Sequence, residues 1–147
     1  MTYTERLTPS AGVFLAWALL IPGGLLVFLP VSIWTAIAAA IVFYASACAA
    51  LLLLAPRVSV EDGEFRAGRA HIPVSVIAGA SAHRGADATA ERGPRLDARA
   101  YLCIRGWIDP VVRVELADPT DPTPYWIVST RHPEDLIAAL DAARTPA

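Results

Sequence analysis

Aromatic and arginine side chains in the C-terminal third of this 147-residue sequence are the first candidates for a functional surface. The set is Arg105, Trp107, Tyr125, Trp126 and Arg131. Tryptophan, tyrosine and arginine dominate the strongest contacts of binding interfaces. These residues therefore predict a partner-binding face, on which Tyr125 or Trp126 lies near the surface beside Arg105 or Arg131. The alternative is that the tryptophans fill a small core and the arginines are solvated.

Arginines that follow a long apolar stretch form a second group, namely Arg57, Arg66 and Arg69. An arginine close to an anionic lipid surface contributes about 1 kcal/mol to binding. We therefore expect these side chains to lie near membrane lipid. Acidic residues are interleaved with them, so a simply solvated charge is the alternative.

The remaining reactive residue types show no catalytic or ligand pattern. The histidines are His71, His83 and His132. They lack metal-ligand spacing, both among themselves and with the two cysteines. Asp118 and Asp121 each precede a proline, where aspartate commonly holds a turn. Ser129 lies near a histidine but lacks the glycine pattern of a nucleophile elbow. We predict no catalytic residue, no metal, no cofactor and no enzymatic activity.

Two very different segments must position these side chains. Residues 7–56 are fifty residues without Asp, Glu, Lys, Arg or His. A bilayer core about 30 Å thick is crossed by roughly 20 helical residues, so this stretch can cross twice. We predict a polar tail at residues 1–10 and a two-helix transmembrane hairpin at residues 11–56. Its crossings are expected at residues 12–28 and 33–54, joined by a turn at residues 29–32.

Small and helix-breaking residues shape the predicted hairpin. Pro22-Gly23-Gly24 should kink the first helix. In the second helix, Ala36 and Ala40 share one face, and Ala45 and Ala49 share another. Such faces permit close helix contact, either within the hairpin or between two copies of the chain.

Charge around the hairpin predicts its orientation. Arg6 and Arg57 flank the apolar stretch, and the predicted turn carries no charge. Basic residues concentrate on the cytoplasmic side of membrane proteins, so both termini are expected in the cytoplasm. All twelve Lys and Arg positions hold arginine, which together with abundant alanine suggests a GC-rich bacterial gene. The expected location is the bacterial inner membrane.

Residues 57–147 have the pattern of a small α+β domain. Alternating strands at residues 57–61 and 65–67 surround Asp62-Gly63, a strong hairpin-turn signal. Further strands are expected at residues 74–78, 101–104, 112–116 and 125–130, and residues 79–100 as a long loop, with a short helix inside it as an alternative. Pro133 begins an amphipathic C-terminal helix. The net charge of −2 does not favour nucleic-acid binding.

This order of antiparallel strands and one closing helix resembles a pleckstrin-homology-like domain. The segments Tyr101-Leu-Cys-Ile-Arg-Gly-Trp-Ile108 and Asp118-Pro-Thr-Asp-Pro-Thr-Pro-Tyr-Trp-Ile-Val-Ser-Thr-Arg131 go further. With the paired crossings, they are similar to DUF3093, a family of uncharacterised bacterial membrane proteins. The resemblance implies an architecture of two transmembrane helices and a pleckstrin-homology-like domain. It implies no activity, ligand or catalytic residue.

The sequence thus predicts an α+β membrane protein that presents a cytoplasmic binding module. Its expected partners are membrane lipid and a protein or a second copy of the chain. The alternative function is that of an accessory subunit in a larger membrane complex, acting through its transmembrane hairpin.

Overall fold

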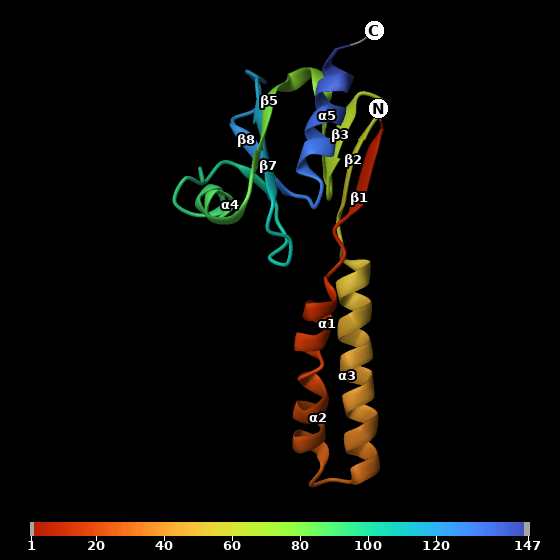
Figure 1. Ribbon diagram of the computed structural model, residues 1–147. Helices are drawn as coiled ribbons and strands as arrows, with labels where there is room; N and C mark the ends of the chain where they lie inside the picture. Colours follow the sequence, from red (N-terminus) through yellow and green to blue (C-terminus); the bar gives the residue numbers. More distant parts are fainter. Residues whose placement is uncertain (1, 146–147) are drawn as a thin grey trace. The chain divides into compact units, whose positions relative to one another are not determined.

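A computed structural model describes residues 2–145 and divides the chain into two compact units (Figure 1). The hairpin unit comprises Thr8–Ala55. The domain combines the chain that precedes Thr8 with the chain that follows Ala55. The hairpin is therefore an insertion in the domain, whereas the sequence predicted that it precedes a domain at residues 57–147.

Three helices form the hairpin unit: α1 (Ala11–Trp17), α2 (Leu20–Phe28) and α3 (Ile33–Leu53). Ser32 caps α3, since its hydroxyl oxygen accepts a hydrogen bond from Trp34 N at 3.3 Å. The predicted turn at residues 29–32 is confirmed, because it separates the end of α2 from the start of α3.

The break between α1 and α2 falls at Ala18 and Leu19, one turn before Pro22. A proline cannot donate its backbone nitrogen, and its ring collides with the carbonyl group four residues earlier. That group belongs to Ala18, whose oxygen instead accepts from Ile21 N at 3.0 Å in a tighter turn. The kink predicted at Pro22-Gly23-Gly24 is thus a helix break displaced towards the N-terminus.

Gly24 allows α2 and α3 to pack closely. It is buried, and a β-carbon at this position would lie 3.2 Å from the Cα atom of Ala40. Ala36 and Ala40 are buried in the hairpin, whereas Ala45 and Ala49 are exposed. The first pair of alanines therefore serves packing inside the hairpin, and the second pair remains on its surface.

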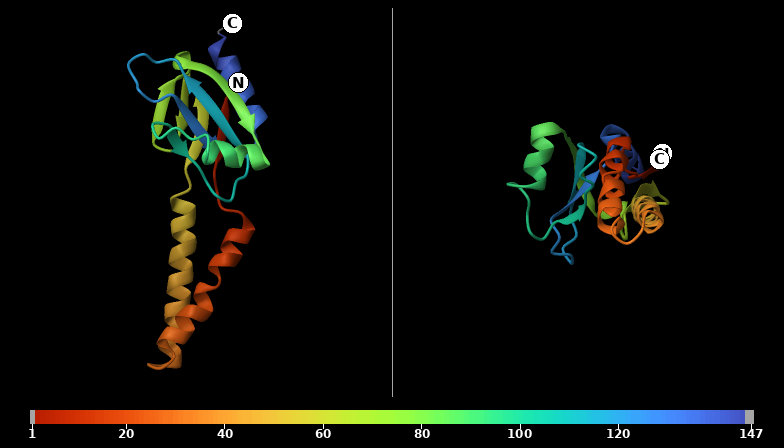
Figure 2. Two further views of the ribbon diagram at one scale, coloured as in Figure 1. Left: turned by 90° about the vertical axis from the view of Figure 1, so that its left-hand side faces the viewer. Right: turned by 90° about the horizontal axis from the view of Figure 1, so that it is seen from below.

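Two four-stranded sheets form the domain (Figures 1 and 2). The first has the order β1 (Tyr3–Arg6), β2 (Arg57–Glu61), β3 (Glu64–Ala67), β4 (Ala70–Pro73), all antiparallel. The second has the order β5 (Ile77–His83), β7 (Val111–Leu116), β8 (Tyr125–Ser129), β6 (Tyr101–Cys103), in which β6 is parallel to β8. The predicted Asp62-Gly63 turn joins β2 to β3, and both residues have positive φ, 51° and 75°.

The main core lies between the two sheets and α5 (Pro133–Arg144). It contains Val58, Val60 and Phe65 of the first sheet, Val112, Val114, Trp126 and Val128 of the second, and Leu136 and Leu140 of α5. Helix α5 contacts β1 and β2 as well as β5 and β7. The predicted amphipathic helix is confirmed, and its apolar side closes the space between the sheets.

The predicted polar tail at residues 1–10 is wrong for Tyr3–Arg6, which form β1. The strand is hard to recognise in the sequence because its inward-facing residues, Tyr3 and Glu5, are polar like its exposed residues, Thr4 and Arg6. The Glu5 carboxylate accepts hydrogen bonds from Tyr3 Oη at 2.7 Å and from Thr130 Oγ1 at 2.6 Å. Burial is the main cause that raises the pKa of Tyr3. A charged strand is held here because its inward polar groups have partners.

Residues 74–100 also differ from the prediction. The expected strand at residues 74–78 is instead a turn of 3-10 helix, η1 (Val74–Val76), followed by the start of β5. The expected loop at residues 79–100 contains most of β5 and α4 (Gly85–Arg92). Small residues such as Gly79, Ala80 and Ala82 suit a strand whose partner β7 supplies the bulky valines.

We expect a chain in which Asn-Gly replaces residues 8–55 to yield a soluble, folded domain. Arg6 pairs with Arg57, and Leu7 N donates to Pro56 O at 2.9 Å, so a two-residue turn can join the strands. Circular dichroism and urea denaturation should show one cooperative transition.

The matched comparison is residues 56–147 alone, which lack β1. Leu7 is fully buried, and loss of such a side chain costs about 2–5 kcal/mol. The free energy of unfolding should therefore be lower by at least about 2 kcal/mol. Equal stability of the two chains would contradict the inserted-hairpin architecture.

In the hairpin, Gly24→Leu should lower the melting temperature of the full chain in detergent, because the new side chain collides with the Ala40 backbone. Gly23→Leu is the matched control, since a β-carbon at Gly23 meets nothing within 4 Å. Indistinguishable melting temperatures for the two variants would count against this helix contact.

Candidate functional site

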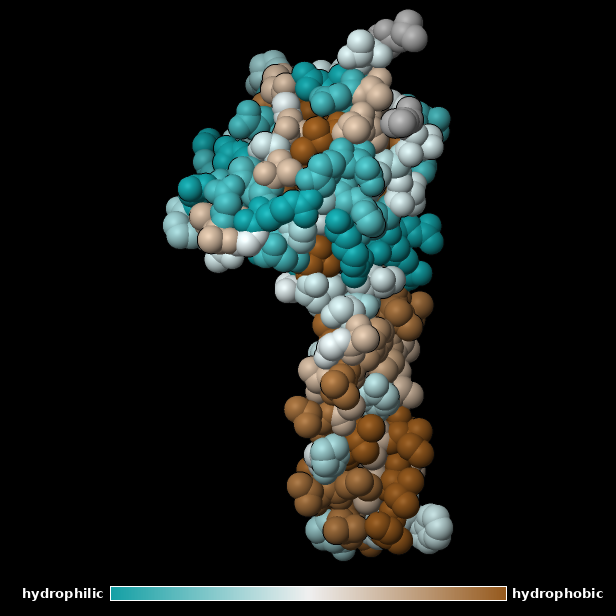
Figure 3. Space-filling view, viewed as in Figure 1, coloured by the Kyte–Doolittle hydropathy of each residue, from teal (hydrophilic) through white to brown (hydrophobic). Residues whose placement is uncertain are grey.

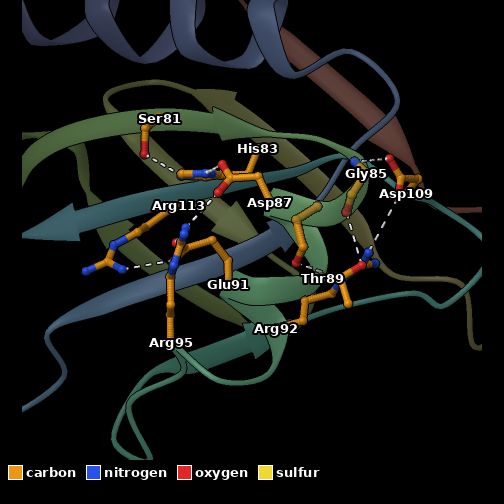
Figure 4. Close-up of polar contacts among 11 residues, drawn as sticks. Ser81, His83, Gly85, Asp87, Thr89, Glu91, Arg92, Arg95, Asp109 and Arg113 are labelled. Carbon is orange, nitrogen blue, oxygen red and sulfur yellow. Dashed lines mark hydrogen bonds and ion pairs between the residues drawn. The ribbon is translucent and has the colours of Figure 1, made fainter.

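A dense group of polar side chains lies where β5 leads into α4 (Figure 4). His83 ends β5, Asp87 and Glu91 belong to α4, and Arg95 follows the helix. Asp87 and Glu91 lie one turn apart on one side of the helix, and His83 and Arg95 contact them from its two ends. Arg113 of β7 reaches the same group from the sheet, so the cluster joins α4 to two strands.

A continuous chain of hydrogen bonds runs through this cluster. Ser81 Oγ lies 2.9 Å from His83 Nε2, and His83 Nδ1 lies 2.5 Å from Asp87 Oδ2. Arg95 Nη1 donates to Asp87 at 2.6 Å and to Glu91 at 3.2 Å. These contacts connect an exposed serine on the sheet edge to the interior of the helix–sheet junction.

Glu91 is the buried centre of the cluster, with 4% of its side chain exposed. Arg113 Nη1 donates to its Oε2 atom at 3.0 Å. Burial by itself would raise the pKa of Glu91, but the hydrogen bonds from Arg113 and Arg95 outweigh it and lower that pKa. Glu91 is therefore held as a carboxylate between two guanidinium groups.

Arg113 also stacks on Tyr125, with its guanidinium carbon 3.8 Å from the ring centre. The Tyr125 hydroxyl accepts from Asp97 N at 2.6 Å and donates to Arg95 O at 3.3 Å. Ala88 of α4, Val111 and Ile127 pack beside this ring in a second, smaller core. The cluster and this core together attach α4 and the following loop to the outer side of the second sheet.

Two chemical functions, metal binding and hydrolysis, use residue types that this cluster contains. His83, Asp87 and Glu91 each offer a ligand atom, and these atoms lie within 4.8 Å of one another. However, the two carboxylates already face two arginines, so a divalent cation would have to displace bound guanidinium groups. The donor set fits an ion-pair network better than a metal site.

The order Ser81–His83–Asp87 matches that of a hydrolase relay. A nucleophile also requires hydrogen-bond donors for the oxyanion that it creates. The nearby amide of Gly85 already donates to Asp109 Oδ2 at 2.8 Å. The contacts of the cluster thus support attachment of α4, and the absence of catalysis stays a prediction.

The sequence interpretation missed this cluster because it considered the histidines for zinc-type spacing and for a nucleophile beside Ser129, but not as part of a charged helical series. The usable signal is the regular series His83, Asp87, Glu91, Arg95, with one member every four residues. Such a series predicts a helical stripe of alternating charge. Its link to Arg113 depends on sheet pairing and was not visible in the sequence.

The five residues of the predicted partner-binding face do not form one surface. Tyr125 and Trp126 are each 4% exposed, so the prediction that one lies near the surface is wrong. Trp126 faces the main core against Tyr101 and Phe65, whereas Tyr125 lies under the α4 side of the sheet. Both sides of β8 are covered because residues 79–100 supply a helix, α4, that packs on the side of Tyr125.

The other three residues of that face are partly accessible. Arg105 and Trp107 lie close together, with 6.0 Å between the guanidinium carbon and the indole ring. Arg131 pairs with Glu5 of β1 at 3.3 Å, so it helps to hold the N-terminal strand. Whether Arg105 and Trp107 bind a partner stays a prediction.

The predicted lipid-proximal arginines gather at one end of the first sheet. Arg57 and Arg66 lie on the outer side of β2 and β3, and Arg69 follows in the β3–β4 turn. All three are exposed, and Arg66 forms an ion pair with Glu64. This sheet end also carries Arg6, directly opposite Arg57 in the ladder.

Removal of the buried carboxylate should destabilise the domain in a pH-dependent way. At pH 7, Glu91→Gln should cost about 1–3 kcal/mol, because it weakens the contacts of Arg113 and Arg95. The native pKa of Glu91 is lowered, so its stabilising contribution is complete above the unfolded value of about 4.3. This contribution disappears as the pH falls through the native pKa.

Melting temperatures at pH 7 and pH 3 provide the measurement. The drop on acidification should be smaller for Glu91→Gln than for the unaltered chain. Glu115→Gln is the matched control, since Glu115 also approaches Arg113 but its side chain is 58% exposed. An identical acid response in Glu91→Gln and the unaltered chain would refute the buried ion pair.

Comparison with known proteins adds a family but no activity. Neither the curated proteins nor the solved structures contain a match to this chain. The family model described as protein of unknown function, DUF3093, matches residues 2–140. That match includes β1, the hairpin and nearly all of the domain. The resemblance found in the sequence is confirmed, and the chain belongs to the DUF3093 family.

Proposed function

We propose that this protein is a two-pass membrane protein whose hairpin holds a binding domain at the membrane surface. The observation that carries this proposal is the exposure of two long apolar segments, Ala11–Phe28 and Ile33–Leu53. Their mean hydropathies are 2.2 and 2.3, yet only 6% and 11% of them is buried. Figure 3 shows mainly hydrophobic side chains over the visible surface of the hairpin.

A core helix of a soluble protein is mostly buried, whereas these two apolar segments are mostly exposed. Leu15, Leu26 and Leu53 are each at least 74% exposed, and each leucine left in water forgoes about 1.5–3 kcal/mol of burial. A lipid bilayer removes that cost and leaves the helical backbone satisfied by its own hydrogen bonds. The lengths of 18 and 21 residues suit two crossings.

Strand pairing supports an even number of crossings. β1 precedes the hairpin, β2 follows it, and the two strands are adjacent in one sheet. Both ends of the hairpin must therefore emerge on the same side of the membrane. The flanking Arg6 and Arg57, with no charge in the turn at residues 29–32, favour the cytoplasm of a bacterial cell as that side.

For the domain we propose a non-enzymatic, pleckstrin-homology-like binding module. The support is a four-stranded antiparallel meander, then the antiparallel set β5, β7 and β8, then one closing helix. The parallel edge strand β6 and helix α4 depart from that simple pattern. The ligand that we propose for this module is membrane lipid or a protein partner.

A second candidate function is that of an accessory subunit that acts through its hairpin. One observation favours it, an apolar hollow of about 290 Å³ on the hairpin surface. It is lined by Ile21, Leu25, Ile37, Ala40, Ile41, Tyr44 and Ala45. A helix of another subunit or of a second copy could fill such a hollow, since small residues such as Ala45 permit close approach.

Alkaline carbonate extraction tests the membrane proposal. The full chain should stay in the membrane pellet, because two uncharged helices lose their lipid environment only when the bilayer is dissolved. Release into the supernatant would overturn the proposal. The chain with Asn-Gly in place of residues 8–55 is the matched control and should be released.

Cysteine labelling tests the orientation. Cys48→Ala and Cys103→Ala remove the two native thiols. In that background, Thr145→Cys should react with an impermeant thiol reagent only after spheroplasts are opened. Val31→Cys, in the turn between α2 and α3, should react in intact spheroplasts. The reverse pattern would place the domain outside the cell.

A further inference from the structure

The outer face of the first sheet carries positive charge at one end of its strands and negative charge at the other. Its basic end carries Arg6 of β1, Arg57 of β2, and Arg66 and Arg69 near the end of β3. Its acidic end carries Glu61, Asp62 and Glu64 around the β2–β3 turn. Glu61 lies four positions after Arg57, which is about 13 Å along an extended strand.

The basic end lies next to the hairpin in the chain. Leu7 alone separates Arg6 from Thr8, and Pro56 alone separates Arg57 from Ala55, where the hairpin unit begins and ends. Two residues of extended chain span at most about 7 Å. If the hairpin crosses a bilayer, as proposed above, both arginines are held at the depth of the lipid headgroups.

Register places two like charges side by side at this point. Arg6 and Arg57 are direct cross-strand partners, and both are exposed. Two guanidinium groups at one register position concentrate positive charge at this end of the sheet. The hydrogen bond from Leu7 N to Pro56 O, at 2.9 Å, closes the ladder beside the pair and fixes its position.

Neighbouring side chains extend this pair into a shallow polar hollow. Arg57, Ser59 and Arg66 line one end of a hollow of about 380 Å³ on the outer face. The acidic turn residues lie at its other end. Ser59 adds a hydroxyl group that can donate a hydrogen bond beside the two arginines.

We propose that the Arg6–Arg57 pair, with Arg66 and Ser59, binds the phosphate of an anionic phospholipid headgroup. Guanidinium groups bind phosphate oxygens through strong, charge-assisted hydrogen bonds. The acidic end of the same face is repelled by an anionic surface, so the basic end alone faces the lipid phosphates. This inference rests on the membrane proposal and adds the class of lipid and the residues that select it.

Lipid binding to the full chain in mild detergent, followed by native mass spectrometry, tests the proposal. The unaltered chain should bind phosphatidylglycerol more tightly than phosphatidylcholine. Arg6→Gln and Arg57→Gln should each weaken phosphatidylglycerol binding about fivefold, with little effect on phosphatidylcholine. Arg99→Gln is the matched control, since Arg99 is exposed and paired with Asp97 in the loop after α4.

Two further measurements distinguish a loss of lipid binding from a loss of folding and from binding of free phosphate. The melting temperature of Arg57→Gln without anionic lipid should stay close to that of the unaltered chain, because Arg57 is exposed and substitutions of exposed side chains rarely change stability. A tenfold excess of inorganic phosphate should not displace phosphatidylglycerol, whereas displacement would assign the site to free phosphate and overturn the lipid assignment. Equal binding of the two lipids by a chain that resists carbonate extraction would refute this inference alone.

Discussion

The pairing of β1 with β2 is the contact on which the rest of this structure depends. These strands are adjacent in space, yet the whole hairpin unit, Thr8–Ala55, lies between them in the chain. A connection of 48 residues thus takes the place that a short turn holds in an ordinary β-hairpin. Closing so long a connection has an entropic cost, which the contacts of β1 must offset.

Buried contacts of β1 meet this requirement. Leu7 is fully buried, and the Glu5 carboxylate accepts hydrogen bonds from Thr130 Oγ1 and from the backbone N–H of Arg131. The N-terminal strand is therefore tied both to its neighbour β2 and to the junction of β8 with α5. This double attachment fixes Leu7 and Pro56, the domain residues that flank the hairpin unit in the chain.

Polar contacts also attach a distant segment to the second sheet, in this case α4. The Glu91–Arg113 pair and the Tyr125 hydroxyl attach α4 to a sheet face that would otherwise expose Tyr125 and Ile127. The cost of burying the Glu91 carboxylate is offset by its hydrogen bonds with the guanidinium groups of Arg95 and Arg113. Both sheets are thus covered on one side by the shared core, and the second also by α4.

Features with a local cause were predictable from the sequence. The apolar hairpin, the Asp62-Gly63 turn and the C-terminal helix at Pro133 each follow from short-range patterns and were predicted correctly. β1 was missed because its four polar and charged residues have no apolar strand pattern. Their stabilising partners are distant in the chain, and Thr130 is 125 residues from Glu5. The burial of Tyr125 was missed for the same reason, since α4 covers that side of β8 only after the sheet has formed. Trp126 instead lies in the main core, as the alternative of core-filling tryptophans had it. The candidate cluster shares this limit, because Arg113 joins it through strand pairing.

The inserted position of the hairpin also sets the order of events during biosynthesis. β1 leaves the ribosome first, but β2 follows only after both apolar helices have been made. Its other partners, Thr130 and Arg131, emerge close to the end of translation. Ribosomes add about 5–20 residues per second, so β1 waits several seconds for these contacts. Synthesis of the whole hairpin therefore precedes completion of the domain, and a chain truncated before residue 130 retains an unanchored first strand.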